Sequence, residues 1–144
     1  MLLLPLHAAA TLVMFGVILI VKRVHYPLFP HVRAADYEAF QAAHMRRITW
    51  IVGPAMAVEL ATAGWIVWAP PPGLPAWMGW AGLALVLVIW ATTGLVQVPL
   101  HARLTQGFDA AAHRRLVATN WVRTAAWALR AGLVCWMLGR GLGA

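Results

Sequence analysis

Two charged side chains lie deep inside apolar stretches, where their chemistry needs an explanation. Glu59 lies about eleven residues, or about 16 Å of helix, beyond the polar boundary at Ile48. Arg130 lies at a similar depth in the last apolar stretch. Because an unpaired charge at the centre of a bilayer costs at least about 3 kcal/mol, we predict that the two form a buried ion pair. Such a pair would clamp two helices together, relay protons or hold a polar ligand.

A row of polar side chains around Arg130 predicts an internal site larger than one ion pair. At 3.6 residues per turn, one helix face carries His113, Asn120, Arg123, Thr124, Trp127 and Arg130. Lipid does not tolerate such a face, so it should point into a helix bundle. Guanidinium groups bind carboxylates in a bidentate manner, which suits cofactor propionates or an anionic substrate. The candidate catalytic residues are Glu59, Asn120, Arg123 and Arg130.

Histidines provide the second type of candidate. Those at the predicted inner ends of the apolar stretches are His25, His44, His101 and His113. Imidazole binds zinc, copper, iron and haem, so these four are candidate metal ligands; alternatively, they bind headgroup phosphate or water. No Glu-x-x-His pair is present, so a di-iron carboxylate site would lack its ligands. The candidate cofactor-binding residues are His7, Arg123, Trp127 and Arg130.

The composition indicates what must position these residues. Hydrophobic residues make up 62% of the 144 and charged residues only 10%, whereas a soluble domain has about 25% charged residues. This excludes an ordinary soluble enzyme and a disordered chain, and a single cysteine excludes an internal disulfide. Four stretches are long enough to cross about 30 Å of hydrocarbon: about 3–24, 48–68, 77–98 and 116–138. We therefore predict an all-α, four-transmembrane-helix bundle that forms one integral membrane domain.

The distribution of cations predicts the orientation of the bundle. The net charge is +7, and cations concentrate between the first and second spans and between the third and fourth. The positive-inside rule places these connections in the cytoplasm and both termini outside, in a bacterial inner membrane. The expected partner is the lipid bilayer, not nucleic acid. Gly16, Gly94 and Gly132 would also allow a homo-oligomer or a larger membrane complex.

Turn and capping residues set the predicted limits of the helices. A tight break between the second and third spans contains Pro70, Pro71, Pro72, Gly73 and Pro75. Asp36 and Asp109 are predicted N-caps, the first for a helix near Tyr37 and the second for a helix after Gly107. The basic connections are therefore expected to be partly helical.

The two halves of the chain resemble each other. Thr49–Trp50 matches Asn120–Trp121 at an offset of 71 residues, and the same offset carries Trp65 onto Trp136 and Glu59 onto Arg130. Tyr26-Pro27-Leu28 matches Val98-Pro99-Leu100 at an offset of 72. We therefore predict two similar two-helix repeats related by an axis along the membrane normal. Equivalent residues can meet at such an axis, which favours pairing of Glu59 with Arg130.

One segment carries a family resemblance. Residues 45–56, with the sequence MRRITWIVGPAM, resemble the second span of the HemJ-type bacterial protoporphyrinogen oxidases. His7 is similar to a histidine early in that family's first span, and Asn120 lies near its Arg-to-Asn-Glu segment, although Trp121 replaces the glutamate. The resemblance implies a small helical membrane protein that binds haem b and oxidises protoporphyrinogen IX.

These observations together favour a membrane redox protein that binds haem b or a transition metal, in which case it would be a membrane oxidoreductase. In that interpretation His7 or the inner histidines bind the centre, and Glu59 orients Arg130 or carries protons. Two alternatives remain open. The protein is a non-catalytic membrane subunit or assembly factor if its centre is closed and tightly packed. It is a carrier of lipids or other small molecules if a cavity opens sideways.

Overall fold

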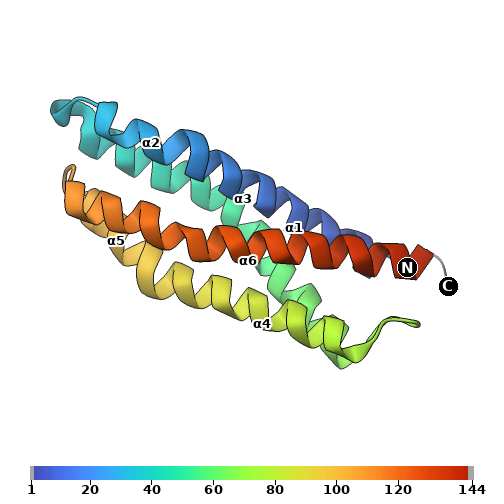
Figure 1. The fold of residues 1–144 in the computed structure, drawn as a ribbon. Helices are drawn as coiled ribbons and strands as arrows, with labels where there is room; N and C mark the ends of the chain where they lie inside the picture. The colour runs from blue at the N-terminus through green and yellow to red at the C-terminus, as the bar shows by residue number, and fades with distance from the viewer. Residues whose placement is uncertain (1, 143–144) are drawn as a thin grey trace.

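The computed structural model describes residues 2–142, which form long helices joined by short connections (Figure 1). Helix α1 (Leu3–Ile20) continues through a π-helical turn η1 (Val21–His25), α2 (Tyr26–Leu28) and a 3-10 turn η2 (Phe29–His31). Helix α3 spans Ala34–Trp68. Helix α4 (Ala76–Thr92) continues through a second π-helical turn η3 (Thr93–Gln97) into α5 (Val98–Leu104), and α6 spans Ala110–Leu142. The described residues include no strand, so the all-α prediction is confirmed.

The helices form an antiparallel bundle. The start of α1, the end of α6 and the proline-rich loop lie at one end, and the other two connections lie at the opposite end (Figure 1). Helices α1 and α4 each pack against both α3 and α6, so α3 and α6 occupy diagonal positions. A side chain that joins α3 to α6 must therefore cross the centre of the bundle.

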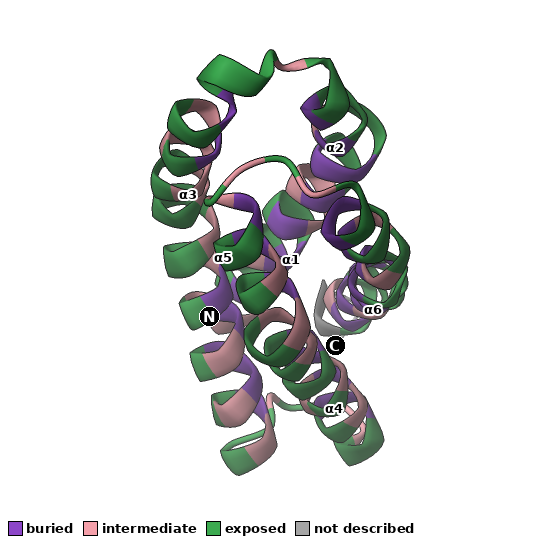
Figure 2. Ribbon diagram, turned by 90° about the vertical axis from the view of Figure 1, so that its left-hand side faces the viewer, coloured by how far each residue is buried: buried purple, intermediate pink, exposed green. Residues whose placement is uncertain are grey.

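Three helical stretches are long and apolar enough to cross a membrane: Leu3–His31, Ala34–Trp68 and Ala76–Leu104. Helix α6, which contains the fourth predicted span, is not among them. Its polar residues reduce its hydropathy, yet Asn120, Arg123 and Arg130 are all buried inside the bundle. Figure 2 shows buried surfaces facing inward and exposed surfaces facing outward on each long helix. The outward surfaces carry many large apolar side chains, which is typical of a protein that is solvated by lipid.

The helices extend beyond the predicted spans at the end that carries the basic connections. Helix α3 begins at Ala34, three residues before the predicted start near Tyr37 and well before the span that begins at Ile48, and the first helical stretch continues to His31, beyond the predicted span end at Val24. These extensions enclose an aromatic core built from Tyr26, Phe29, Tyr37, Leu104 and Leu116. Burial of this core stabilises helical structure beyond the apolar spans. The length of an apolar stretch therefore does not show where these helices begin and end.

The predicted caps have different outcomes. Asp109 is confirmed as a cap, because its Oδ1 accepts hydrogen bonds from the backbone N–H groups of Ala111 (2.8 Å) and Ala112 (3.0 Å). The hydrogen bond from Ala112 is the main reason that the pKa of Asp109 lies below its usual value. Asp36 is not a cap: Arg33 occupies the N-cap position, and Asp36 in the first turn accepts a 2.7 Å hydrogen bond from Arg33 Nε.

Each π-helical turn lies just before a proline. Turn η1 precedes Pro27, and turn η3 precedes Pro99. Proline has no N–H group, and its ring clashes with the carbonyl of residue i−4 in a regular α-helix. The wider π turn relieves this clash without breaking the helix, and such turns occur frequently at functional sites.

Candidate functional site

The predicted ion pair between Glu59 and Arg130 is confirmed. Arg130 Nε donates to Glu59 Oε1 at 3.1 Å, and both side chains are at most 2% exposed. The other carboxylate oxygen, Oε2, accepts a hydrogen bond from Trp127 Nε1 at 3.0 Å. Both Glu59 oxygens therefore accept hydrogen bonds from α6, the helix diagonally opposite α3. A buried carboxylate requires such partners.

Arg130 connects its helix to the other three. Its Nη1 donates to the carbonyl oxygen of Gly82 in α4 at 2.6 Å, and its Nη2 donates to Thr11 Oγ1 in α1 at 3.1 Å. With Glu59 in α3, all three guanidinium nitrogens have protein acceptors. This centre is closed, which is the geometry of a structural clamp.

His7 lies beside this clamp. Its ring is 2% exposed, and its Nδ1 lies 2.6 Å from Thr62 Oγ1. The Thr62 hydroxyl itself donates to the carbonyl oxygen of Val58 at 2.6 Å, so His7 Nδ1 is the donor to Thr62. Neither of the two cavities described below is lined by His7, Trp127 or Arg130. These three predicted cofactor-binding residues therefore belong to the packed centre.

The four inner histidines do not converge on one point. His25 Nε2 and His44 Nδ1 share a 2.8 Å hydrogen bond, and the ring centroids of His44 and His101 lie 5.6 Å apart. His113 instead bonds through Nε2 to the carbonyl oxygen of Tyr26 at 2.9 Å. Within residues 2–142, no three His, Cys, Asp or Glu side chains are placed to hold a metal ion.

His101 is held in a defined orientation. The Gln41 side-chain amide donates to its Nδ1 at 2.9 Å, which places the ring proton on Nε2. Nε2 then donates to the Tyr26 hydroxyl oxygen at 3.1 Å. Both ring nitrogens have protein partners, and these two hydrogen bonds fix the orientation of the His101 ring.

A cavity of about 250 Å³ occupies the half of the bundle nearest the basic connections. Its deeper part is apolar and includes Met14, Ile18, Val52 and Met56. Its other part is polar and is formed by Tyr26, His44, Gln97, His101 and Arg123. Four lining residues are exposed at the protein surface: Thr49, Gly53, Trp90 and Val98. The cavity therefore opens sideways between α3 and the helical stretch formed by α4, η3 and α5.

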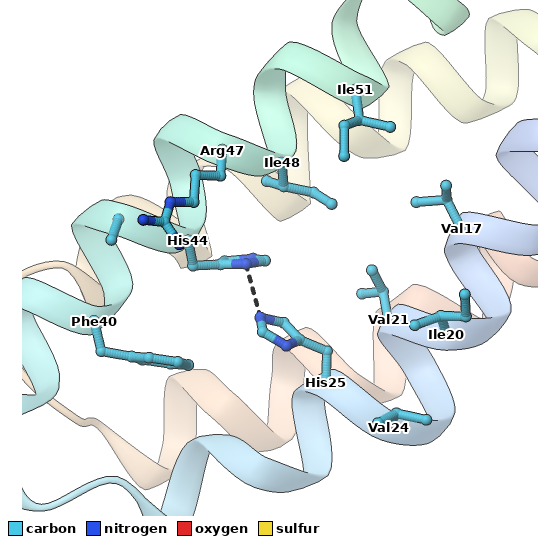
Figure 3. Close-up of a pocket in the computed structure, with 11 residues that line it drawn as sticks. Val17, Ile20, Val21, Val24, His25, Phe40, His44, Arg47, Ile48 and Ile51 are labelled. Carbon is cyan, nitrogen blue, oxygen red and sulfur yellow. Dashed lines mark hydrogen bonds between the residues drawn. The ribbon is translucent and has the colours of Figure 1, made fainter.

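A second cavity of about 440 Å³ lies between α1 and α3. It is mostly apolar, and Figure 3 shows the rings of His25 and His44 pointing toward each other across its polar end. Arg47 lies beside this end, whereas Ile20 and Ile51 lie toward the apolar end (Figure 3). His44, Ile48, Val17 and Val21 line both cavities, so these side chains form the wall between them.

Arg123 differs from Arg130 because its charge is not paired. The side chain is 6% exposed and lines the first cavity. Nη1 donates to Asn120 Oδ1 at 3.3 Å, while Nε has no hydrogen-bond partner within the described chain. Asn120 is fully buried, and its Nδ2 also lacks a partner there. Two adjacent buried donors therefore have no acceptor, and of the two residues only Arg123 lines the cavity.

Several polar residues of this site were not predicted from the sequence. Thr11, Thr62, Tyr26 and Gln41 all bond to predicted residues. A helical-face pattern indicates three of them. Thr11 follows His7 by four residues, and Gln41 lies three residues before His44. Thr62, three residues after Glu59, carries the same signal, whereas Tyr26 does not, because no predicted residue lies three or four positions from it.

The geometry thus separates a closed, fully bonded centre from an open cavity with free donors. The centre around Glu59 and Arg130 can hold helices together, and the cavity beside Arg123 can accept a ligand. Comparison of the chain with protein-family models, with curated proteins and with solved structures found no match.

Proposed function

We propose that this protein is a four-span integral membrane protein that binds a lipid-soluble small molecule between its helices. The observation that carries the proposal is the 250 Å³ cavity, which is apolar toward the centre of the bundle and polar toward the basic connections. A mostly apolar cavity with a few convergent polar groups is the usual form of a ligand site. Its exposed rim faces the side of the bundle, from which a membrane-dissolved molecule would arrive.

The two-repeat architecture forms part of this proposal. Turns η1 and η3 begin at Val21 and Thr93, an offset of 72 residues, and each precedes a Pro-Leu pair. Thr11 and Gly82, which both accept hydrogen bonds from Arg130, differ by 71 residues. These offsets equal the 71- and 72-residue offsets between the similar sequence segments, which supports two similar repeats. The cavity would then lie in one half of a pseudosymmetric bundle.

Helix α6 is proposed as the fourth span, with both termini outside a bacterial inner membrane. Its charged residues within the span face the bundle, and exposed tryptophans lie near both ends of the proposed spans, as in aromatic belts. In a Cys135→Ser background, Gly139→Cys, at the exposed far end of α6, should react with a membrane-impermeant maleimide on intact cells. Gln106→Cys should react only after permeabilisation. The reverse pattern would invert the topology, and labelling of both without permeabilisation would remove α6 as a span.

Haem-dependent redox chemistry is the second candidate function. His44 Nε2 has no partner within the described chain, and the ring lines both cavities, so it is the histidine best placed to bind iron. A bound haem would supply electron transfer, while Arg123 would hold a propionate. The small volume of the inner cavity favours a lipid-like ligand, since sites for drug-sized molecules usually measure about 300–1,000 Å³.

Filling the cavity tests the proposal. Gly53 lines it, and a Cβ added there would contact only Thr49 Cγ2, at 4.0 Å, so Gly53→Leu extends into open space. The probes are stearic acid and its methyl ester, each carrying a nitroxide near the head. In vesicles of zwitterionic lipid, at least one probe should be motionally restricted, and Gly53→Leu should reduce that fraction about tenfold.

The matched control is Gly64→Leu. Gly64 lies on the same helix, a Cβ added there would meet no atom within 4 Å, and the residue lines neither cavity. It should leave the restricted fraction unchanged. Equal effects of the two variants, or no restriction of either probe in the wild type, would refute the cavity as a ligand site. An absorption spectrum of the same sample tests the redox candidate, because a Soret band would identify the ligand as haem.

A further inference from the structure

We infer that the ligand is a single-chain amphiphile with one negative charge, and that its acid group binds Arg123. The inference rests on the proposed function and adds the chemical class of the ligand, its anchoring residue and its route. It starts from the charge balance of the buried interior, where one guanidinium has no counter-ion.

No acidic side chain is available to neutralise Arg123. The chain contains only four acidic residues: Asp36, Glu38, Glu59 and Asp109. Three of them form ion pairs with Arg33, Arg130 and Arg103. The fourth, Glu38, is exposed in the extramembrane part of α3. A buried charge requires a partner, so the counter-ion of Arg123 has to come from outside the chain.

The free hydrogen-bond donors match the oxygens of an acid. Arg123 Nε and Asn120 Nδ2 both lack partners within residues 2–142, and each needs an acceptor. Of the neighbours of Arg123, the Trp127 ring, 5.1 Å from the guanidinium carbon, offers only its π face, and the Tyr26 hydroxyl is an uncharged acceptor. A carboxylate has two acceptor oxygens and binds guanidinium in a bidentate manner. A neutral headgroup would satisfy the donors but would leave the buried charge uncompensated.

The dimensions of the cavity indicate one acyl chain. About 250 Å³ is less than an ordinary ligand site provides, so the cavity holds the head and the first part of a chain. The remainder would leave through the opening rimmed by Thr49, Trp90 and Val98, which leads into the surrounding lipid. A second chain attached to the same head would have to pass between Val17, Val21, His44 and Ile48, the side chains that separate the two cavities.

The orientation of the cavity matches that of a lipid in the adjacent leaflet. The polar groups His101 and Arg123 lie toward the basic connections, and Met14 and Met56 lie toward the middle of the bundle. A lipid in that leaflet also has its head toward the basic connections and its chain toward the midplane. An anionic amphiphile would therefore enter sideways without turning over.

The experiment compares the two nitroxide probes used above, which differ only in charge. At pH 9, where the acid is ionised, wild-type protein should hold stearate at least about tenfold more tightly than its methyl ester, because only the ionised acid carries a charge that compensates Arg123. Arg123→Met should abolish this preference while the ester still binds. Arg123→Lys retains the charge and should retain most of the preference.

The matched control is Arg46→Met, which removes an exposed cation near the same membrane surface. It should leave the preference intact, since exposed charges are screened. Equal binding of acid and ester by the wild type, or a full preference in Arg123→Met, would overturn the inference but not the proposed function. If neither probe enters the cavity, the proposed function itself fails.

Discussion

Replacing Glu59 by alanine should lower the free energy of unfolding by about 3–5 kcal/mol, because the change leaves Arg130 buried without its carboxylate partner. The Trp127 indole N–H also loses its acceptor. Arg130 would retain its bonds to Gly82 and Thr11, but neither partner carries a charge. Thermal unfolding of purified protein in a mild detergent, followed by circular dichroism, measures the loss.

The double variant Glu59→Leu with Arg130→Met separates the loss of a partner from the net value of the pair. Apolar replacement of both members of a buried pair is often neutral or stabilising, so we expect it to recover most of the stability. Asp36→Ala removes an exposed ion pair with Arg33 and should have no measurable effect. A small effect of Glu59→Ala would mean that the centre admits water, contrary to the closed geometry described above.

Trp127→Ala should be about as damaging, with a loss of about 3–5 kcal/mol. The indole is fully buried and packs in the apolar cluster that contains Met14, Met56 and Ile89. Truncation would leave a large cavity at the point where Glu59 Oε2 needs its donor. The same detergent unfolding assay gives the magnitude.

The conservative variant Trp127→Phe divides this loss into two parts. It retains most of the packing but removes the indole N–H, so it should cost about 1.5–3 kcal/mol, the value of a hydrogen bond to a charged group. In the background Glu59→Leu with Arg130→Met, the phenylalanine variant should cost much less. An unchanged cost in that background would show that packing, and not the bond to Glu59, accounts for the effect.

The structure assigns different roles to the two buried arginines. Arg130 is saturated by partners on all three other helices, whereas Arg123 lacks a carboxylate partner within the described chain and faces a cavity. The sequence places both on one polar helix face and makes both candidates for binding an anion, although it predicts an ion pair with Glu59 only for Arg130. The distinction depends on which acceptors the other helices bring to each position.

Much of the architecture follows from the sequence alone. Three of the four apolar stretches, the proline-rich break and the Asp109 cap depend on local chemistry, and the structure agrees with each of them. The pairing of Glu59 with Arg130 was also predictable, because lipid leaves a buried charge few other partners. The inward-facing polar side of α6 follows from the helical period for the same reason.

The site beside Arg123 could not be predicted in the same way. The histidines looked equivalent by type and position, yet His113 bonds to a backbone carbonyl while His101 is fixed by Gln41 and Tyr26. Cavities, free donors and hydrogen-bond partners arise where side chains from different helices meet, and a local pattern does not specify those distances. For this reason the sequence predicts the bundle and its central clamp, while the cavity and its unpaired charge emerge only from the packing of four helices.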